Sequence, residues 1–224
     1  AASQGSKSVL AFLPNNAEGI LREAVLREVA GAAEMDVSVV KYDRTAESIR
    51  TAIGESTIQF DKSDSLYIPD GGKVPSIILN SLRDLGMTTK DKQILGSGNW
   101  ESAPISNPEF ANALFPKRDT SNFEPFAQRY QTVYSSKPGV QAALGYDAVT
   151  LVSELIRQNG KNAFSNSVVE NARGFSGING LFRLRFDGTT ERGLAIYQVR
   201  EGKAELIAPA PRSFNSFNRF GSGN

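Results

Sequence analysis

Residues Ser8–Leu13 have the sequence SVLAFL and are followed by the turn residues Pro14-Asn15-Asn16. This stretch gives the clearest indication of the class of fold. A short apolar run bounded by turn residues is typical of a buried strand in a parallel sheet. Asn15 or Asn16 is expected to cap a helix that follows. The apolar residues of that segment recur at helical spacing and predict an amphipathic helix: they are Ile20, Leu21, Ala24, Val25, Leu26 and Val29.

The same strand-and-helix unit recurs along the first half of the chain. Three more short apolar runs have the composition of strands, and they are Val37–Tyr42, Ser65–Ile68 and Gln93–Leu95. Between the last two, Val74–Leu85 has helical periodicity, and Gly86 is placed to end that helix. Four such units in series predict a parallel sheet covered by helices. We therefore expect an α/β protein built as a three-layer, parallel-sheet lobe.

The second half of the chain has a different pattern. Apolar positions at helical spacing predict helices within residues 123–133 and 144–158. Leu181–Phe186 then alternates apolar and basic residues and ends at Asp187-Gly188, a dipeptide typical of hairpin turns. A second hairpin is expected within residues 194–207. The sequence thus predicts short antiparallel strands near the C-terminus.

The composition narrows the classes of function. The 224 residues include no histidine and no cysteine, which removes the commonest general base and the strongest nucleophile at neutral pH. Lys and Arg number 25 against 24 Asp and Glu, so the chain lacks the basic excess of nucleic-acid binders. No apolar run reaches the ~18 residues of a membrane span. We expect a protein that binds without catalysing a reaction, with no cofactor, metal or nucleic-acid partner.

Three loops are expected beyond the carboxyl ends of the strands, where open parallel sheets bind ligands. They are Pro14–Gly19, Pro69–Gly72 and Ser97–Glu101. Their polar and glycine residues allow backbone N–H groups to approach a ligand. We predict ligand contacts from Asn15, Asn16, Asp70, Trp100 and Glu101, with Glu18 as a further candidate.

Each candidate has a structural alternative that the sequence leaves open. The two asparagines could serve only as helix caps. Asp70 could belong to no more than a tight turn with the two glycines that follow it. Trp100 could be a core residue, and Glu101 could be solvated.

Several segments occur in an order that resembles one protein family. They are Asn15-Asn16-x-x-Gly19, YIPDGG at 67–72, LGSGNW at 95–100, GYDAV at 145–149 and GFSGINGLFRLRFDGTTERGLAIYQV at 174–199. Together they resemble type I periplasmic binding proteins, which include the amino-acid receptors of ABC transporters. The C-terminal part is also similar to lipoproteins that activate penicillin-binding proteins and use the same two-lobed fold.

The resemblance implies a division of the chain between two lobes. Residues 1–137 would form a Rossmann-like α/β unit of the second lobe, and residues 138–192 would return to the first. Residues 193–207 would be a terminal hairpin in the second lobe. The N-terminal part of the first lobe would be absent from this sequence. Residues 208–224 form a tail, either at the surface or docked on the domain, in which phenylalanine recurs at every third residue from Phe214.

The resemblance also implies a function. The protein would be an extracytoplasmic receptor that closes by hinge motion on a small polar ligand, an amino acid or a peptide-like compound. Backbone N–H groups would bind the ligand carboxylate, and Asp70 or Glu101 would meet its ammonium group. Tyr146, near the crossover between lobes, would be a further ligand contact, with helix packing against the other lobe as its alternative. The partner would be an ABC permease and the location the periplasm, with a lipid anchor on a preceding segment. The alternative is a regulatory lipoprotein domain that binds a peptidoglycan synthase through its surface.

Overall fold

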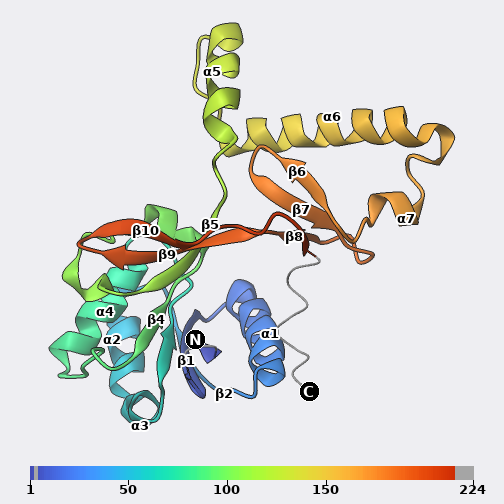
Figure 1. Ribbon diagram of the computed structural model, residues 1–224. Coiled ribbons are helices and arrows are strands. Elements are labelled where there is room, and N and C mark those ends of the chain that lie inside the picture. The colour runs from blue at the N-terminus through green and yellow to red at the C-terminus, as the bar shows by residue number, and fades with distance from the viewer. Residues whose placement is uncertain (3–4, 215–224) are drawn as a thin grey trace. The chain divides into compact units, whose positions relative to one another are not determined.

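The computed structural model describes residues 1–2 and 5–214 (Figure 1). They form two compact units, which are Ala1–Lys117 with Ile196–Ile207, and Arg118–Ala195 with the described residues from Ala208 onward. Of the tail phenylalanines, Phe214 is buried, whereas Phe217 and Phe220 lie outside the described residues.

The first unit is built on a seven-stranded sheet with the order β10-β9-β5-β4-β3-β1-β2. Neighbouring strands from β1 to β5 run parallel. This confirms the predicted parallel α/β sheet, and the expected hairpin β9–β10 extends one edge of it. The strands are β1 (Ser8–Pro14), β2 (Asp36–Tyr42), β3 (Ser65–Tyr67), β4 (Gln93–Leu95), β5 (Leu114–Arg118), β9 (Leu194–Arg200) and β10 (Lys203–Ala208).

Helices cover both faces of this sheet. Figure 1 shows α1 on one face and α2 and α4 on the other, which gives the three layers that the sequence predicted. Two short 3-10 helices follow β4. The helical elements are α1 (Ala17–Ala32), α2 (Ala46–Gly54), α3 (Thr57–Asp61), α4 (Val74–Asp84), η2 (Gly98–Ser102) and η3 (Pro108–Phe110).

The main core lies between the sheet and helices α2 and α4. Because strand side chains alternate between the two faces, Leu10 and Phe12 of β1 share one side of the sheet. One buried cluster joins them to the apolar ridges of both helices. Those ridges are made by Ile49, Ile53, Ile78, Leu79 and Leu82.

Helix α1 departs from its predicted orientation. Its apolar residues were expected to share a buried face, but four of them are more than half exposed: Ile20, Leu21, Val25 and Val29. The buried positions of α1 are Gly19 and Ala30. Gly19 lies so close to β1 that a Cβ added to it would be 1.8 Å from the carbonyl oxygen of Pro14. Small residues therefore face the sheet and set the rotation of the helix.

The second unit combines helices with a three-stranded antiparallel sheet of order β6-β7-β8. The predicted turn at Asp187-Gly188 joins β7 to β8, and Gly188 has the positive φ of 79° that such turns require. None of the helices in the described ranges is long and apolar enough to span a membrane. The elements are α5 (Phe123–Tyr134), α6 (Val140–Asn159), η4 (Gly160–Asn162), α7 (Asn166–Val169), β6 (Phe175–Gly177), β7 (Gly180–Leu184) and β8 (Thr190–Arg192).

A small core of its own holds the second unit together. Phe126 of α5 packs in one buried cluster with Ala143 of α6 and Ile178. Helix α5 therefore groups with the second unit, and the compact units divide after Lys117 rather than after residue 137.

Candidate functional site

In the first unit, the order in which strands are added to the sheet reverses between β1 and β3. Strands β2 and β3 lie on opposite sides of β1, so the connections that leave β1 and β3 run in opposite directions. Open α/β sheets bind ligands beyond the strand ends at such a point. Five polar residues from the start of α1, the end of β2 and the loops after β2 and β3 are joined there. We call them the edge network: Glu18, Arg22, Tyr42, Arg44 and Asp70.

Asp70 is the buried anchor of the edge network. It follows β3 and is 2% exposed. Arg44, in the loop after β2, binds both of its oxygens, with Nε–Oδ2 at 3.0 Å and Nη2–Oδ1 at 2.7 Å. The hydroxyl of Tyr42 donates to Oδ2 at 2.8 Å. A bidentate guanidinium and a buried hydroxyl thus fix one carboxylate.

Glu18 extends the network across the start of α1. Its Oε2 accepts from Nη2 of Arg44 at 2.6 Å. Its Oε1 accepts from Arg22, one helical turn further on, at 2.8 Å from Nη2 and 3.1 Å from Nε. Two guanidinium groups and two carboxylates therefore connect the start of α1 with the loops after β2 and β3.

The protonation states follow from these contacts. Burial opposes the charge of Asp70, but the bonds from Arg44 and Tyr42 outweigh it and hold the pKa of Asp70 below its usual value. Hydrogen bonds from Arg44 and Arg22 lower the pKa of Glu18. Burial and the bond to Asp70 raise the pKa of Tyr42. At neutral pH both carboxyl groups are anions and the Tyr42 hydroxyl keeps its proton.

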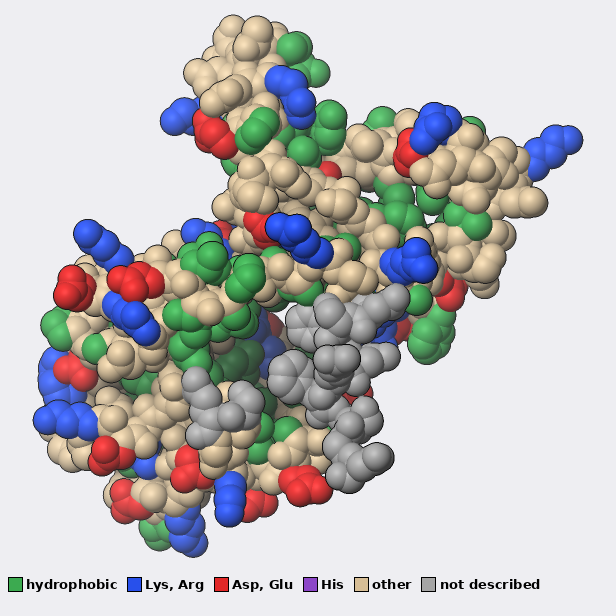
Figure 2. Space-filling model, viewed as in Figure 1, with side chains coloured by type: hydrophobic (Ala, Val, Ile, Leu, Met, Phe, Trp, Pro, Cys, Tyr) green, Lys and Arg blue, Asp and Glu red, His purple; other side chains and the backbone are tan. Residues whose placement is uncertain are grey.

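Charge is balanced at the site and mixed on the surface. Two anions face two cations in the edge network. On the face shown in Figure 2, basic and acidic side chains are interspersed rather than gathered by sign. Within residues 1–2 and 5–214, no group of three or more acidic side chains lies close enough to hold a metal ion.

The structure brings some of the sequence-predicted residues to this edge and places others elsewhere. Asn16 caps α1, because its Oδ1 accepts from the N–H of Gly19 at 3.0 Å. Asn15 is exposed, and its N–H donates to the carbonyl of Tyr42 at 2.7 Å. Glu101 is exposed on η2. Tyr146 belongs to the second unit, where its ring lies 5.2 Å from that of Phe126.

Trp100 is a core residue, which was the alternative to its predicted ligand contact. Its side chain is 1% exposed, and its Nε1–H donates to the carbonyl of Ile68 at 2.8 Å. Its ring meets Phe110 edge to face at 5.0 Å. Gly96 serves this packing, since a Cβ there would lie 2.3 Å from the Trp100 ring. The glycine-rich loop therefore accommodates an indole ring.

Three residues of the edge network were not predicted from the sequence: Tyr42, Arg44 and Arg22. Tyr42 and Arg44 flank the carboxyl end of β2, which is the same position in the sheet that singled out the other three loops. The three predicted loops combine polar residues with glycine, whereas the loop after β2 contains no glycine. Position at a strand end, without a glycine criterion, is the signal that would have found Arg44.

Acid is expected to remove the contribution of Asp70 to stability. An unfolded aspartate has a pKa of about 3.9, and that of Asp70 is lower in the folded protein. Its contribution is therefore complete above pH 3.9 and is lost as pH falls through the folded pKa. Urea unfolding followed by the fluorescence of Trp100, the single tryptophan, should show Asp70→Asn about 2 kcal/mol less stable than wild type at pH 7. That difference should shrink toward pH 2.

The control for this experiment is Asp84→Asn, which breaks an ion pair between two half-exposed side chains. Its effect should stay within about 0.5 kcal/mol at every pH. A difference between wild type and Asp70→Asn that stayed constant down to pH 2 would contradict the assignment of an ionised Asp70.

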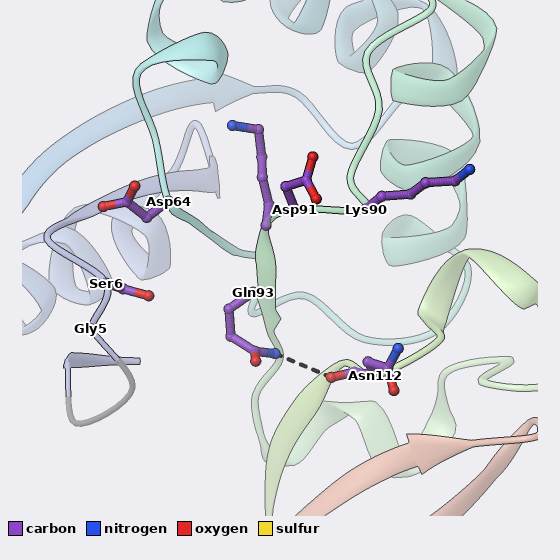
Figure 3. Close-up of a pocket in the computed structure, with 8 residues that line it drawn as sticks. Gly5, Ser6, Asp64, Lys90, Asp91, Gln93 and Asn112 are labelled. Carbon is purple, nitrogen blue, oxygen red and sulfur yellow. Dashed lines mark hydrogen bonds between the residues drawn. The ribbon is translucent and has the colours of Figure 1, made fainter.

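A cavity of about 410 Å³ lies at the opposite, amino-terminal edge of the same sheet (Figure 3). Two of its charged side chains form hydrogen bonds with the backbone. Asp64 accepts the N–H groups of Lys7 and Ser8 at 2.8 and 3.0 Å. Lys92 donates to the carbonyl of Ser63 at 2.6 Å. In Figure 3 the side chains of Asp64 and Lys90 extend away from each other, so they do not converge on a ligand.

Sequence comparisons identify no relative of the chain. No protein-family model matches it. No curated protein sequence matches it significantly.

The fold, in contrast, has many solved counterparts, and it is that of type I periplasmic binding proteins. A putative branched-chain amino acid ABC transporter from Rhodospirillum rubrum matches with a TM-score of 0.70 at 19% identity, over 92% of this chain and 62% of its own. A leucine-binding protein from Thermotoga maritima gives 0.64 at 19%, over 92% and 61%. A solute-binding protein from R. palustris in complex with benzoate gives 0.61 at 16%, over 94% and 61%.

Each match covers only part of the solved protein. The chain spans 61% to 62% of the length of these three proteins. At identities of 16% to 19% the likeness establishes the fold.

Proposed function

We propose that the chain provides the ligand-binding surface of an extracytoplasmic receptor that captures a small organic solute for an ABC permease. The observation that carries the proposal is the edge network, which lies at the carboxyl ends of β1, β2 and β3, where the strand order reverses. Structures with the same fold are solute-binding proteins of ABC transporters, some of them solved with leucine or benzoate. Hinge closure over this edge would then trap the solute.

The finer proposal is a ligand of the amino-acid type. The sequence offered Asp70 and Glu101 as partners for its ammonium group. Asp70 is a poor partner as placed, because Arg44 and Tyr42 already occupy both of its oxygens. Glu101, which is exposed in the third loop, is the other sequence-predicted candidate for an ammonium contact.

Isothermal titration calorimetry of the folded protein tests the proposal. We expect saturable heats with L-leucine, with another of the twenty amino acids or with benzoate. The same titrations of urea-unfolded protein provide the control and should be flat. Flat titrations for every compound, from a protein whose fluorescence and circular dichroism show it to be folded, would rule out the proposed receptor function.

A further inference from the structure

We infer that Arg44 recognises the ligand and that the ligand meets this edge of the sheet through an anionic group, a carboxylate in the simplest case. The inference rests on the proposed receptor function and specifies its chemistry. It reverses the polarity expected from the sequence, in which Asp70 was to hold an ammonium group.

Arg44 keeps unused hydrogen-bond donors in the edge network. All four oxygens of Glu18 and Asp70 already accept from guanidinium groups. Arg44 uses Nε and Nη2 for its bonds. None of the hydrogen bonds within the described part of the chain uses its Nη1, which carries two further N–H groups. A ligand arriving at Arg44 therefore finds a cationic donor, and its complement is an anionic acceptor.

Arg44 is also exposed enough to be reached. Its side chain is 44% exposed, against 3% for the Asp70 side chain behind it. A ligand ammonium would have to displace Arg44 before it touched Asp70. A ligand carboxylate needs no such displacement, because the bonds of Arg44 to Asp70 and Glu18 use Nε and Nη2 and leave out Nη1.

The guanidinium is held in place before any ligand arrives. Asp70 accepts two hydrogen bonds from it, at Nε and Nη2, and Glu18 accepts a further bond from Nη2. The Tyr42 hydroxyl in turn donates to Asp70 and holds that carboxylate in place. Immobilising a free arginine on binding costs free energy, and here that cost falls on the folding of the protein. A positioned, charge-assisted donor also selects for the geometry of its acceptor.

The ligands in the matched structures share the group that this geometry requires. One is solved with leucine, one with benzoate and another with 3,4-dihydroxybenzoic acid. All three compounds carry a carboxylic acid, whereas only leucine carries an ammonium group. A carboxylate is thus the group that these three ligands have in common.

Probes that share an apolar group and carry polar groups of different charge test the inference. Benzoate, benzamide and benzylamine share one ring, and 4-methylpentanoate and 3-methylbutylamine repeat the comparison on the leucine skeleton. Calorimetry of the wild-type protein should show binding of an anionic probe and not of its neutral or cationic partner. Binding of the amines in preference to the acids would overturn the inference and leave the receptor function standing.

Variants at Arg44 localise the effect. Arg44→Met alone would leave the buried Asp70 carboxylate without its ion-pair partner. The preferred variant is therefore the double substitution Arg44→Met with Asp70→Asn, which keeps the net charge unchanged. We expect it to weaken binding of the anionic probe by about 10- to 100-fold. Arg83→Met is the matched control, because Arg83 is also about half exposed and also bonds two carboxylates, those of Asp84 and Glu109.

The outcomes separate the two proposals. Unchanged affinity in the double variant, with thermal unfolding showing both proteins folded, would refute the role of Arg44 while a wild-type response still supports a receptor. Equal losses in the double variant and in Arg83→Met would refute it as well. No response of the wild-type protein to any amino acid or to any of these probes would reject the receptor function, and the inference with it.

Discussion

Replacing Trp100 by alanine is expected to lower the free energy of unfolding of the first unit by about 4 kcal/mol. The side chain is 1% exposed and fills the space between Phe110, Phe115 and the end of β3. Its removal leaves a cavity that the surrounding sheet cannot close, because strand spacing fixes the walls. It also leaves the carbonyl of Ile68 without its donor. Urea unfolding followed by circular dichroism measures the change.

Trp100→Phe is the control for that experiment. It keeps most of the apolar volume and loses the indole N–H, so a loss of about 2 kcal/mol is expected. If Trp100 were instead a ligand contact at the surface, both substitutions would leave stability within about 0.5 kcal/mol of wild type. The two results therefore decide between the core assignment and the earlier expectation of a cleft residue.

Gly19→Ala is expected to destabilise the first unit by about 3 kcal/mol, which is the upper range for forced overpacking. The added Cβ would lie 1.8 Å from the carbonyl oxygen of Pro14. That oxygen is backbone within β1, so it cannot rotate away as a side chain would. Either α1 moves off the sheet or β1 is distorted, and both changes disturb Glu18 and the edge network. Trp100 fluorescence during urea unfolding reports on this unit.

Gly31→Ala provides the matched control in the same helix. A Cβ at Gly31 meets nothing within 4 Å, so only helix propensity changes. Alanine is favoured over glycine in a helix by about 0.5 to 1 kcal/mol, and Gly31→Ala should therefore stabilise the protein slightly. Equal effects of the two substitutions would show that Gly19 is not a close-packing position.

Local patterns predicted the elements of the first unit well. Ser8–Leu13 is within β1, Gln93–Leu95 is β4, and Val74–Leu85 differs from α4 by one residue. Each of these segments carries its own signal, namely a short apolar run between turn residues, or apolar positions at helical spacing that end at glycine. Such signals are local, so a single sequence suffices to read them.

The orientation of α1 could not be predicted in this way. Its periodicity indicated a buried face of large apolar residues, but the contact between Gly19 and Pro14 turns that face outward. Amphipathic patterns show which residues share a side of a helix. Which side meets the sheet depends on how closely two backbones approach, and that distance is set by residues on separate elements.

The candidate site shows the same limit. The sequence pointed to the loops after β1 and β3 and to the residues Glu18 and Asp70 within them. It could not show that Arg44 lies between these two carboxylates, because they are separated from it along the chain by 26 residues on either side. The negative charge of an unpaired aspartate favours a cationic ligand, whereas the charge of an aspartate that is paired with arginine is already neutralised.

The amino-acid sequence was enough to predict an α/β chain with parallel strands, and with polar residues collected at strand ends. These properties follow from composition and from short-range periodicity. Three features emerge from the three-dimensional fold: which polar residues meet, which glycines accommodate a neighbouring group, and which charged side chains are hydrogen-bonded to one another at the edge of the sheet. Those outcomes depend on strand order, since the order of β2, β1 and β3 brings three distant loops within hydrogen-bonding distance.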